Sequence, residues 1–435
     1  MIDAIEIKGY WFLPDDPENR VAGTLTYTPN RKIILELIGA FHDPRDYMMS
    51  LAQGDDKRKE IILGESSDAK SITLINCSSY GSLNFSCSFP MQKFSVQYCL
   101  AGIHLKSWTE EVFNQITVKM PGLTKWVNHY CVDYSIPFKN DRIHGFNLSY
   151  DRDNSNDISV QLTDNINLEL EFTCSPPGTE HEEQLVIEQS YQLNISTKKV
   201  MSFWDLLLQA SKFKSFLTLG TLTSIGYQSI EFYSPDRFQE LKDGEKLFHP
   251  VRFYYNQFDK TDTDAANKKD FLFTHDRIKT SFEEVIKNWY GFDELMAPIL
   301  KHLIESIQEK NIFNTGDFLI VVQALEGYAT RFRPAIPANK KFVTLIEQLT
   351  FLRDEFSYVQ LVKNTSLDLD IVVNSRHYYS HFFEKKANAH VATGIELYEL
   401  TQKLKVILIC CVLSQTGFAQ NDIITIMKAY RDRVN

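Results

Sequence analysis

The spacing of apolar residues changes along this chain of 435 residues, from every second position to every third or fourth. Up to about residue 200 the chain consists of short runs rich in Val, Ile, Thr, Tyr and Phe, such as "INLELEF". After about residue 270, longer runs such as "TGDFLIVVQALEGYATRF" place apolar residues at helical spacing. A chain that carries strand-type and then helix-type patterns is expected to form a β-rich domain followed by a helical one.

We therefore predict an α+β multidomain protein with three regions. Residues 1–200 form an antiparallel β-rich domain of sandwich or barrel-like type. Residues 201–270 are mixed, with one helical segment, further strands and a polar linker over 259–270. Residues 271–435 form an all-helical bundle, because helical segments follow one another there with only short polar breaks.

The composition limits what the chain can do. Hydrophobic residues make up 43% of it, which is enough to build ordinary cores. The net charge of −10 is unlike that of a generally basic nucleic-acid-binding protein, so any contact with RNA or DNA must come from a local patch. The sequence has no GxxxxGK[ST] phosphate loop, dinucleotide fingerprint or GxSxG elbow, which argues against nucleotide-driven motors and hydrolases of those kinds.

The seven cysteines and eleven histidines do not follow metal-ligand spacing. No CxxC pair occurs, so the sequence predicts no zinc site, no other metal, no cofactor and no disulfide framework. The opening "MIDAIEIKGYW" lacks the pattern of a secretory signal, and the apolar run "VILICCVL" is too short to span a bilayer. We expect a protein of a reducing cytoplasm without a membrane segment.

The stretch "RHYYSH" at residues 376–381 is unusual because it lies within an apolar helical segment. Histidine exchanges protons near neutral pH, and arginine keeps its charge while offering a planar set of donors to phosphate oxygens. Metal-independent RNA cleavage needs both properties, since a 2′-hydroxyl must lose its proton and phosphoryl charge must be neutralised. The stretch is therefore a candidate site for that chemistry.

The spacing within this stretch raises a geometric difficulty. Positions 376 and 381 on an α-helix are rotated by roughly 140° and separated by about 7.5 Å of rise, whereas His377 and His381 share a face. Arg376 must reach round, the helix must be irregular, or a second chain must complete the pocket. In the alternative interpretation, the arginine pairs with a carboxylate and the histidines are hydrogen-bonded at a helix interface. The spacing alone leaves both interpretations open.

An arginine followed by four to six residues and a histidine, on a helix of a compact helical domain, is characteristic of the HEPN superfamily. This stretch resembles that motif, with Arg376 and His381 at its two defining positions. The N-terminal half is similar to the β-rich domain of the ApeA family of bacterial anti-phage proteins, in its G-x-W-x-L-P opening and in "ILGESSD" and "PGLTKW". The likeness covers essentially the whole chain, in the same domain order.

The resemblance implies a metal-independent HEPN endoribonuclease of the bacterial cytoplasm that acts in abortive infection and cleaves tRNA or mRNA. It further implies a homodimer or higher homo-oligomer formed through the helical domain. The N-terminal domain would sense a trigger such as a phage protein. A different functional class also fits: a non-catalytic scaffold that dimerises through the helical domain while its β-rich module binds a phage or host partner.

On this resemblance Arg376 is expected to stabilise phosphoryl oxygens and His381 to act as general base or acid. We expect His377 to orient the substrate or the other histidine, with a surface role as the alternative. Glu326, on an otherwise apolar helical segment, is expected to hold Arg376 in place.

Neighbouring residues suggest how RNA would be gripped. Tyr378 and Tyr379 are candidates to stack on an unpaired base, although tyrosines at helical spacing are more often core or dimer contacts. Lys385 and Lys386 are candidates to contact flanking phosphates, with a solvated helix end as the alternative.

Overall fold

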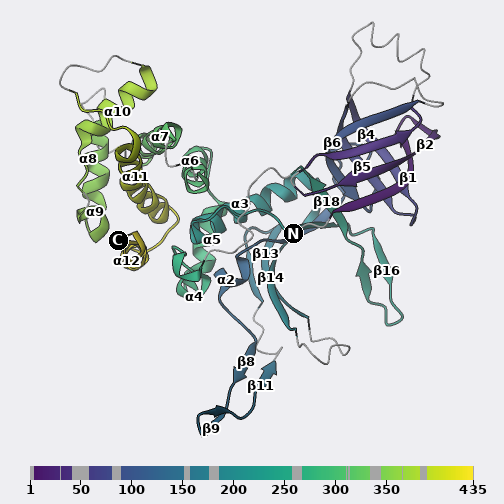
Figure 1. The fold of residues 1–435 in the computed structure, drawn as a ribbon, viewed down its shortest axis with the longest axis horizontal. Coiled ribbons are helices and arrows are strands. Elements are labelled where there is room, and N and C mark those ends of the chain that lie inside the picture. Colours follow the sequence, from purple (N-terminus) through teal and green to yellow (C-terminus); the bar gives the residue numbers. More distant parts are fainter. Residues whose placement is uncertain are drawn as a thin grey trace. The chain divides into compact units, whose positions relative to one another are not determined.

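The computed structural model describes residues 4–29, 31–41, 58–80, 90–150, 157–175, 186–256, 267–309, 311, 314–333, 344–364, 366–382 and 389–434 (Figure 1). The chain forms two compact units, which we call unit 1 and unit 2. Unit 1 comprises Met1–Leu123, Tyr130–Ser211 and Gly226–Thr263, and unit 2 comprises Thr124–His129, Lys212–Ile225 and Asp264–Asn435. Strands dominate unit 1 and helices dominate unit 2, so the predicted fold class is confirmed. The functional boundaries at 200 and 270 stay predictions.

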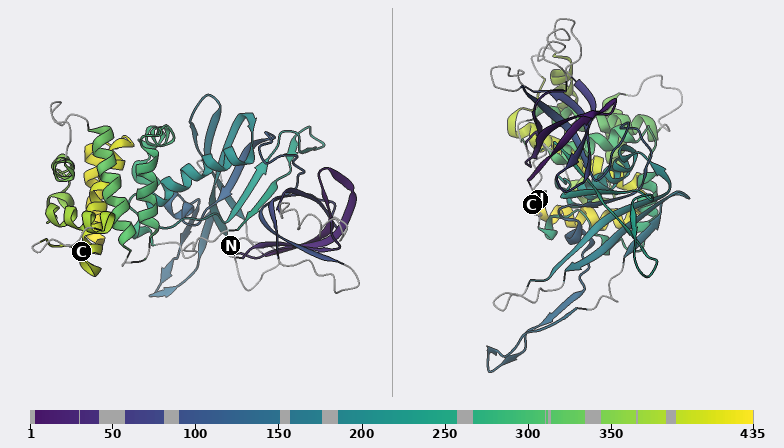
Figure 2. Two further views of the ribbon diagram at one scale, coloured as in Figure 1. Left: turned by 90° about the horizontal axis from the view of Figure 1, so that it is seen from above. Right: turned by 90° about the vertical axis from the view of Figure 1, so that its right-hand side faces the viewer.

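A sheet of twelve strands builds unit 1. Its first six strands are β1 (Ile5–Leu13), β2 (Asp16–Tyr27), β3 (Ile33–Ile38), β4 (Arg58–Ser66), β5 (Ser71–Ser79) and β6 (Met91–Ala101). They follow one another in the order β6-β3-β2-β1-β4-β5, and β5 also pairs with β6, so this part of the sheet closes into a ring (Figure 2). Every pairing in the ring is antiparallel, as predicted.

The core of the ring forms around Trp11, which is fully buried. Inward-facing residues alternate with outward-facing ones along the strands, as in β2, where Val21 and Leu25 are buried. Gly64 on β4 lies opposite Trp11, and a Cβ atom there would clash with the indole ring. Glycine is therefore required at this position so that the large side chain can cross the neighbouring strand.

The sheet continues beyond β6 through β18 (Val251–Tyr255), β15 (Ser229–Tyr233), β7 (Phe113–Lys119), β14 (Glu188–Met201), β13 (Ile166–Ser175) and β12 (Ile158–Gln161). The N-terminal part of α3 (Phe203–Thr221) packs against it, since the buried ring of Phe203 contacts those of Phe232 and Phe253. These residues give unit 1 a second, aromatic part of its core.

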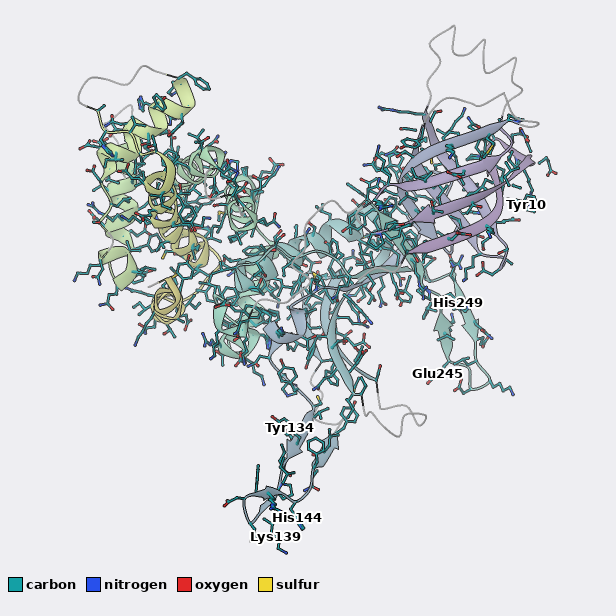
Figure 3. All side chains as sticks on the ribbon, in the orientation of Figure 1. Tyr10, Tyr134, Lys139, His144, Glu245 and His249 are labelled. Carbon is teal, nitrogen blue, oxygen red and sulfur yellow. The ribbon has the colours of Figure 1, made fainter. Side chains whose placement is uncertain are left out.

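Two hairpins extend from unit 1 (Figures 1 and 3). One contains β16 (Phe238–Glu240) and β17 (Lys246–Phe248). The other, which we call the aromatic arm (residues 130–150), contains β8 (Val132–Ser135), β9 (Phe138–Lys139), β10 (Arg142–Ile143) and β11 (Asn147–Tyr150). Tyr134, Lys139 and His144 lie along it (Figure 3). The residues of its four strands are exposed apart from the half-buried Val132.

Helix α11 (Gly394–Gln415) is the longest described helix of unit 2, and further helices precede and follow it along the chain. They are η2 (Lys268–Asp270), α4 (His275–Ile278), α5 (Phe282–Tyr290), α6 (Ala297–Gln308), α7 (Thr315–Phe332), α8 (Leu345–Glu355), α9 (Gln360–Asn364), α10 (Leu369–His381) and α12 (Gln420–Val434). Thirteen of the 22 residues of α11 are buried, and it packs against α6, α7, α8, α9 and α12. A helix that is apolar on nearly all faces belongs in the centre of such a bundle.

A second core region of unit 2 is aromatic. The fully buried Trp126 of α2 (Leu123–Val127) meets Phe216 of α3 and Phe282 of α5 edge-on or tilted. His275 packs its ring against both Trp126 and Phe282. Burial lowers the pKa of His275 to about 4, so this imidazole is neutral at pH 7.

Candidate active site

Helix α10 carries the "RHYYSH" stretch in its last two turns. The helix begins after Asp368, whose side chain accepts hydrogen bonds from the backbone N–H groups of Asp370 and Ile371. It ends at His381, because Phe382 adopts a left-handed conformation with φ +54°. The stretch therefore lies at a helix end, where side chains can project beyond the last turn.

Arg376 and His381 contact each other within one chain. Nη1 of Arg376 donates a hydrogen bond to Nε2 of His381 at 2.9 Å. Because a guanidinium has only donors, this contact assigns the acceptor role to Nε2 and the ring proton to Nδ1. Arg376 thus reaches round the end of the helix, and the pair forms without a second chain.

Glu326 on α7 lies on the other side of the same guanidinium. Nη2 of Arg376 is 3.4 Å from Oε2 of Glu326, and the two side chains are 27% and 37% exposed. The structure thus places Glu326 where it can orient Arg376, at a distance typical of a weak, partly solvated ion pair. The two contacts use two of the five N–H donors of the guanidinium, so other donors can form hydrogen bonds to a phosphate.

Two further side chains of α10 fix the segment that returns after it. The buried Ser375 hydroxyl accepts a hydrogen bond from the backbone N–H of Ala392 at 3.0 Å. The hydroxyl of Tyr379 donates to the carbonyl of Ala392, also at 3.0 Å, and its ring meets Phe318 of α7 edge-on. Sequence analysis did not single out Ser375; the only signal was a small polar residue on the buried face of an apolar helical segment.

The remaining predicted residues lie at the surface or outside the described part. His377 is exposed, and its ring centre lies 5.7 Å from that of His381. Tyr378 is 40% exposed and touches the half-buried Tyr379 edge-on, so of the two tyrosines it presents the more accessible ring. Lys385 and Lys386 lie outside the described residues.

The described side chains and helices also bear on metal binding and on membrane insertion. Within the described ranges, no group of three or more His, Cys, Asp or Glu side chains is arranged to hold a metal ion. No helix in the described part of the chain has the length and apolar character needed to cross a membrane. The six cysteines that the structure describes form no disulfide with one another.

The arrangement suits acid–base chemistry on a phosphodiester. An imidazole can take a proton once its Nε2 lone pair is released from Arg376, and a guanidinium beside it can neutralise charge on phosphoryl oxygens. Residues 319–422, which include all of α10, match the family described as Apea-like HEPN. Residues 319–422 therefore form a HEPN domain.

The strand-rich part makes the assignment more specific. Residues 6–289 match the family described as ApeA N-terminal domain 1, and this match spans more than half of the chain. The chain belongs to the ApeA family, as the resemblance predicted. Neither a curated protein nor a solved structure shows a significant match to it.

Proposed function

We propose that this chain is a metal-independent endoribonuclease of bacterial anti-phage defence, which cleaves tRNA or mRNA in the cytoplasm during abortive infection. Its membership of a family that joins an ApeA N-terminal domain to a HEPN domain supports a nuclease and defence role. The observation that carries the proposal is the 2.9 Å contact between Arg376 and the exposed His381 at the end of α10.

In the proposed reaction, the guanidinium of Arg376 turns from Nε2 of His381 to the phosphoryl oxygens, and Nε2 then removes the proton from a ribose 2′-hydroxyl. The 2′-oxygen attacks the adjacent phosphorus, and the bond between phosphorus and the 5′-oxygen breaks. The 5′-oxygen takes a proton from the imidazolium or from water, which leaves a 2′,3′-cyclic phosphate and a 5′-hydroxyl. Arg376 neutralises the charge that grows on the phosphoryl oxygens, and Glu326 keeps its guanidinium in position.

A cleavage assay tests this proposal. The full chain and His381→Ala are incubated with total tRNA in EDTA, with His390→Ala as the matched control. His390 is an exposed histidine of the same unit, paired with Glu396 at 2.6 Å. We expect the wild type and the control to cleave equally and His381→Ala to be slower by about 10²- to 10⁴-fold.

Two results would contradict the proposal. Equal cleavage by the wild type and His381→Ala would place the activity elsewhere. Absence of cleavage both in the assay and in cells whose growth the protein arrests would favour the non-catalytic scaffold. End-group analysis adds a positive criterion, because the proposed reaction leaves a cyclic phosphate.

Partners are part of the proposal. We infer a homodimer formed through the HEPN domain, to be checked by sedimentation of the full chain. We also infer that unit 1 recognises a phage protein through the aromatic arm. The side chains of Phe138 and Ile143 are 67% and 68% exposed, and in water such a surface is usually an interaction site.

The charges of the arm suggest the kind of partner. Lys139 and Arg142 balance Asp133 and Asp141, so the arm is neutral in a chain of net charge −10 and favours an apolar protein surface. We expect Phe138→Ser with Ile143→Ser to reduce protection against phage without changing RNA cleavage by the purified protein. Unchanged protection would remove the arm from trigger recognition.

A further inference from the structure

A hollow of about 570 Å³ opens beside the candidate active site, between α6, α7 and α10. Arg376 forms part of its lining, so the hollow is continuous with the site. Pro298 and Leu319 give it an apolar wall, and His302 and Gln323 add groups that can donate and accept hydrogen bonds. Its volume lies within the range of about 300–1,000 Å³ that is common for small-ligand pockets.

The charge of the lining favours an anion. Two guanidinium groups, of Arg331 and Arg376, face the single carboxylate of Glu326, and that carboxylate already contacts Arg376. Arg331 donates to the carbonyl of Leu295, which is neutral, and among the described residues it forms no ion pair. The hollow therefore carries net positive charge in a chain whose total is −10.

Gly327 indicates that the hollow is kept open. This glycine lies in the interior of α7 and lines the hollow, and a Cβ atom there would come no closer than 3.8 Å to Ile299, an ordinary contact. Packing in the described residues therefore does not require glycine, although glycine is one of the least favourable residues inside a helix. A larger side chain at this position would take up space in the hollow.

We propose that this hollow binds one nucleotide of single-stranded RNA next to the cleaved phosphodiester. The phosphate of that nucleotide contacts Arg331, and its base lies on the apolar wall formed by Pro298 and Leu319. Gln323 and His302 hydrogen-bond the edge of the base, which makes them the residues that select it. The inference rests on the proposed ribonuclease function and gives that site its substrate-positioning part.

Two variants test the hollow without altering Arg376 or His381. Gly327→Leu fills it, and Arg331→Gln removes its free positive charge; Lys301→Gln, which removes an exposed charge on α6 outside the lining, is the matched control. With a short RNA substrate, we expect both test variants to raise KM by about tenfold or more, because a charge-assisted contact or the space for a nucleotide is lost. The value of kcat should change little, and neither variant should lower the thermal midpoint.

Direct binding separates this inference from the proposed function. The inactive His381→Ala chain is titrated with each of the four nucleoside 5′-monophosphates and with the corresponding nucleosides, by calorimetry. We expect binding of at least one monophosphate that Gly327→Leu abolishes, and that Arg331→Gln reduces to the level of the nucleoside. Absence of monophosphate binding overturns the inference, as does unchanged KM in both variants. RNA cleavage with unchanged KM would overturn the inference while leaving the ribonuclease proposal intact.

A smaller substitution checks that folding does not decide the result. Gly327→Ala adds one methyl group and a better helix former, so we expect the thermal midpoint to rise by about 2–4 °C while KM rises less than in Gly327→Leu. A graded increase in KM from glycine through alanine to leucine, in chains that stay folded, supports a hollow that the substrate fills. Equal KM values across the series contradict it.

Discussion

Helices α10 and α11 belong to the same unit and both follow from apolar runs in the sequence, yet they bury very different amounts of surface. Thirteen of the 22 residues of α11 are buried, whereas α10 buries Val372 and Ser375 among its 13. Helix α11 supplies the core, and α10 presents polar side chains at the surface. We infer that stability and chemistry are divided between neighbouring helices.

The two helices also use the same partner in different ways. Helix α7 gives each of them a carboxylate: Asp317 lies 3.5 Å from Nζ of Lys405 on α11, and Glu326 lies 3.4 Å from Nη2 of Arg376 on α10. The side chains of the first pair are each only 9% exposed. The buried pair is inaccessible to a ligand. The partly exposed guanidinium of Arg376 can exchange the Glu326 carboxylate for a phosphate.

The largest effect on stability is expected from the buried pair. Lys405→Met leaves the Asp317 carboxylate without its cation, and breaking such a pair costs about 3–5 kcal/mol of unfolding free energy. The double variant Lys405→Met with Asp317→Leu should recover most of this loss. Urea unfolding followed by helical circular dichroism measures both, with Lys301→Met in the exposed pair with Glu305 as the control. Equal losses at positions 405 and 301 would contradict the difference between buried and exposed pairs.

The next largest effect is expected at Arg376, at the exposed end of α10. Arg376→Ala should lower the rate of RNA cleavage by about 10²- to 10³-fold, because it removes the group that neutralises phosphoryl charge. The urea midpoint should change little, since the Arg376 side chain is partly solvated and its ion pair is long. Single-turnover cleavage and urea unfolding of the same preparation check both statements. A variant that loses stability and activity together would show that α10 also supports the fold.

Histidines provide a comparison by pH. The pKa of His275 is lowered to about 4, first by burial and then by the charge of Lys279. The unfolded chain takes up that proton near pH 6.5, so the folded state loses stability as pH falls from 6.5 to 4, by roughly 3 kcal/mol in total. We expect His275→Gln to remove this part of the pH dependence in urea unfolding, whereas His144→Gln on the aromatic arm retains it. An unchanged slope in His275→Gln would show that the buried ring does not titrate in this range.

Much of the fold could be predicted because apolar spacing reports which face of an element is buried. The alternating apolar residues that predict a β-rich N-terminal domain are seen in β2, where Val21 and Leu25 face the core. The aromatic arm was not predicted, since its strands bury no face and so carry no such pattern. Helix α10 ends at His381 because Phe382 adopts a left-handed conformation, and the apolar pattern of this stretch does not mark that boundary.

The candidate site could be predicted only in part. Residue type and spacing pointed to Arg376 and His381, and the apolar surroundings of Glu326 pointed to a partner fifty positions away. The sequence could not show whether the arginine would reach the histidine in the same chain, because that depends on where the helix ends. The contacts of Ser375 with Ala392 and the hollow beside α7 arise from tertiary packing, which local patterns do not encode.

The smallest effect is expected at Tyr379, a residue of α10 that has a structural contact. Tyr379→Phe removes the hydrogen bond to the carbonyl of Ala392, and we expect a loss of about 1 kcal/mol in unfolding free energy with cleavage nearly unchanged. Tyr379→Leu removes the aromatic ring as well. If the ring stacks on RNA, the Phe variant keeps normal KM and the Leu variant raises it; if the ring only packs against Phe318, both keep normal KM and the Leu variant is the less stable. The KM values and urea midpoints of the two variants therefore decide whether residues of α10 have separate roles, with Tyr379 supporting the fold and Arg376 the chemistry.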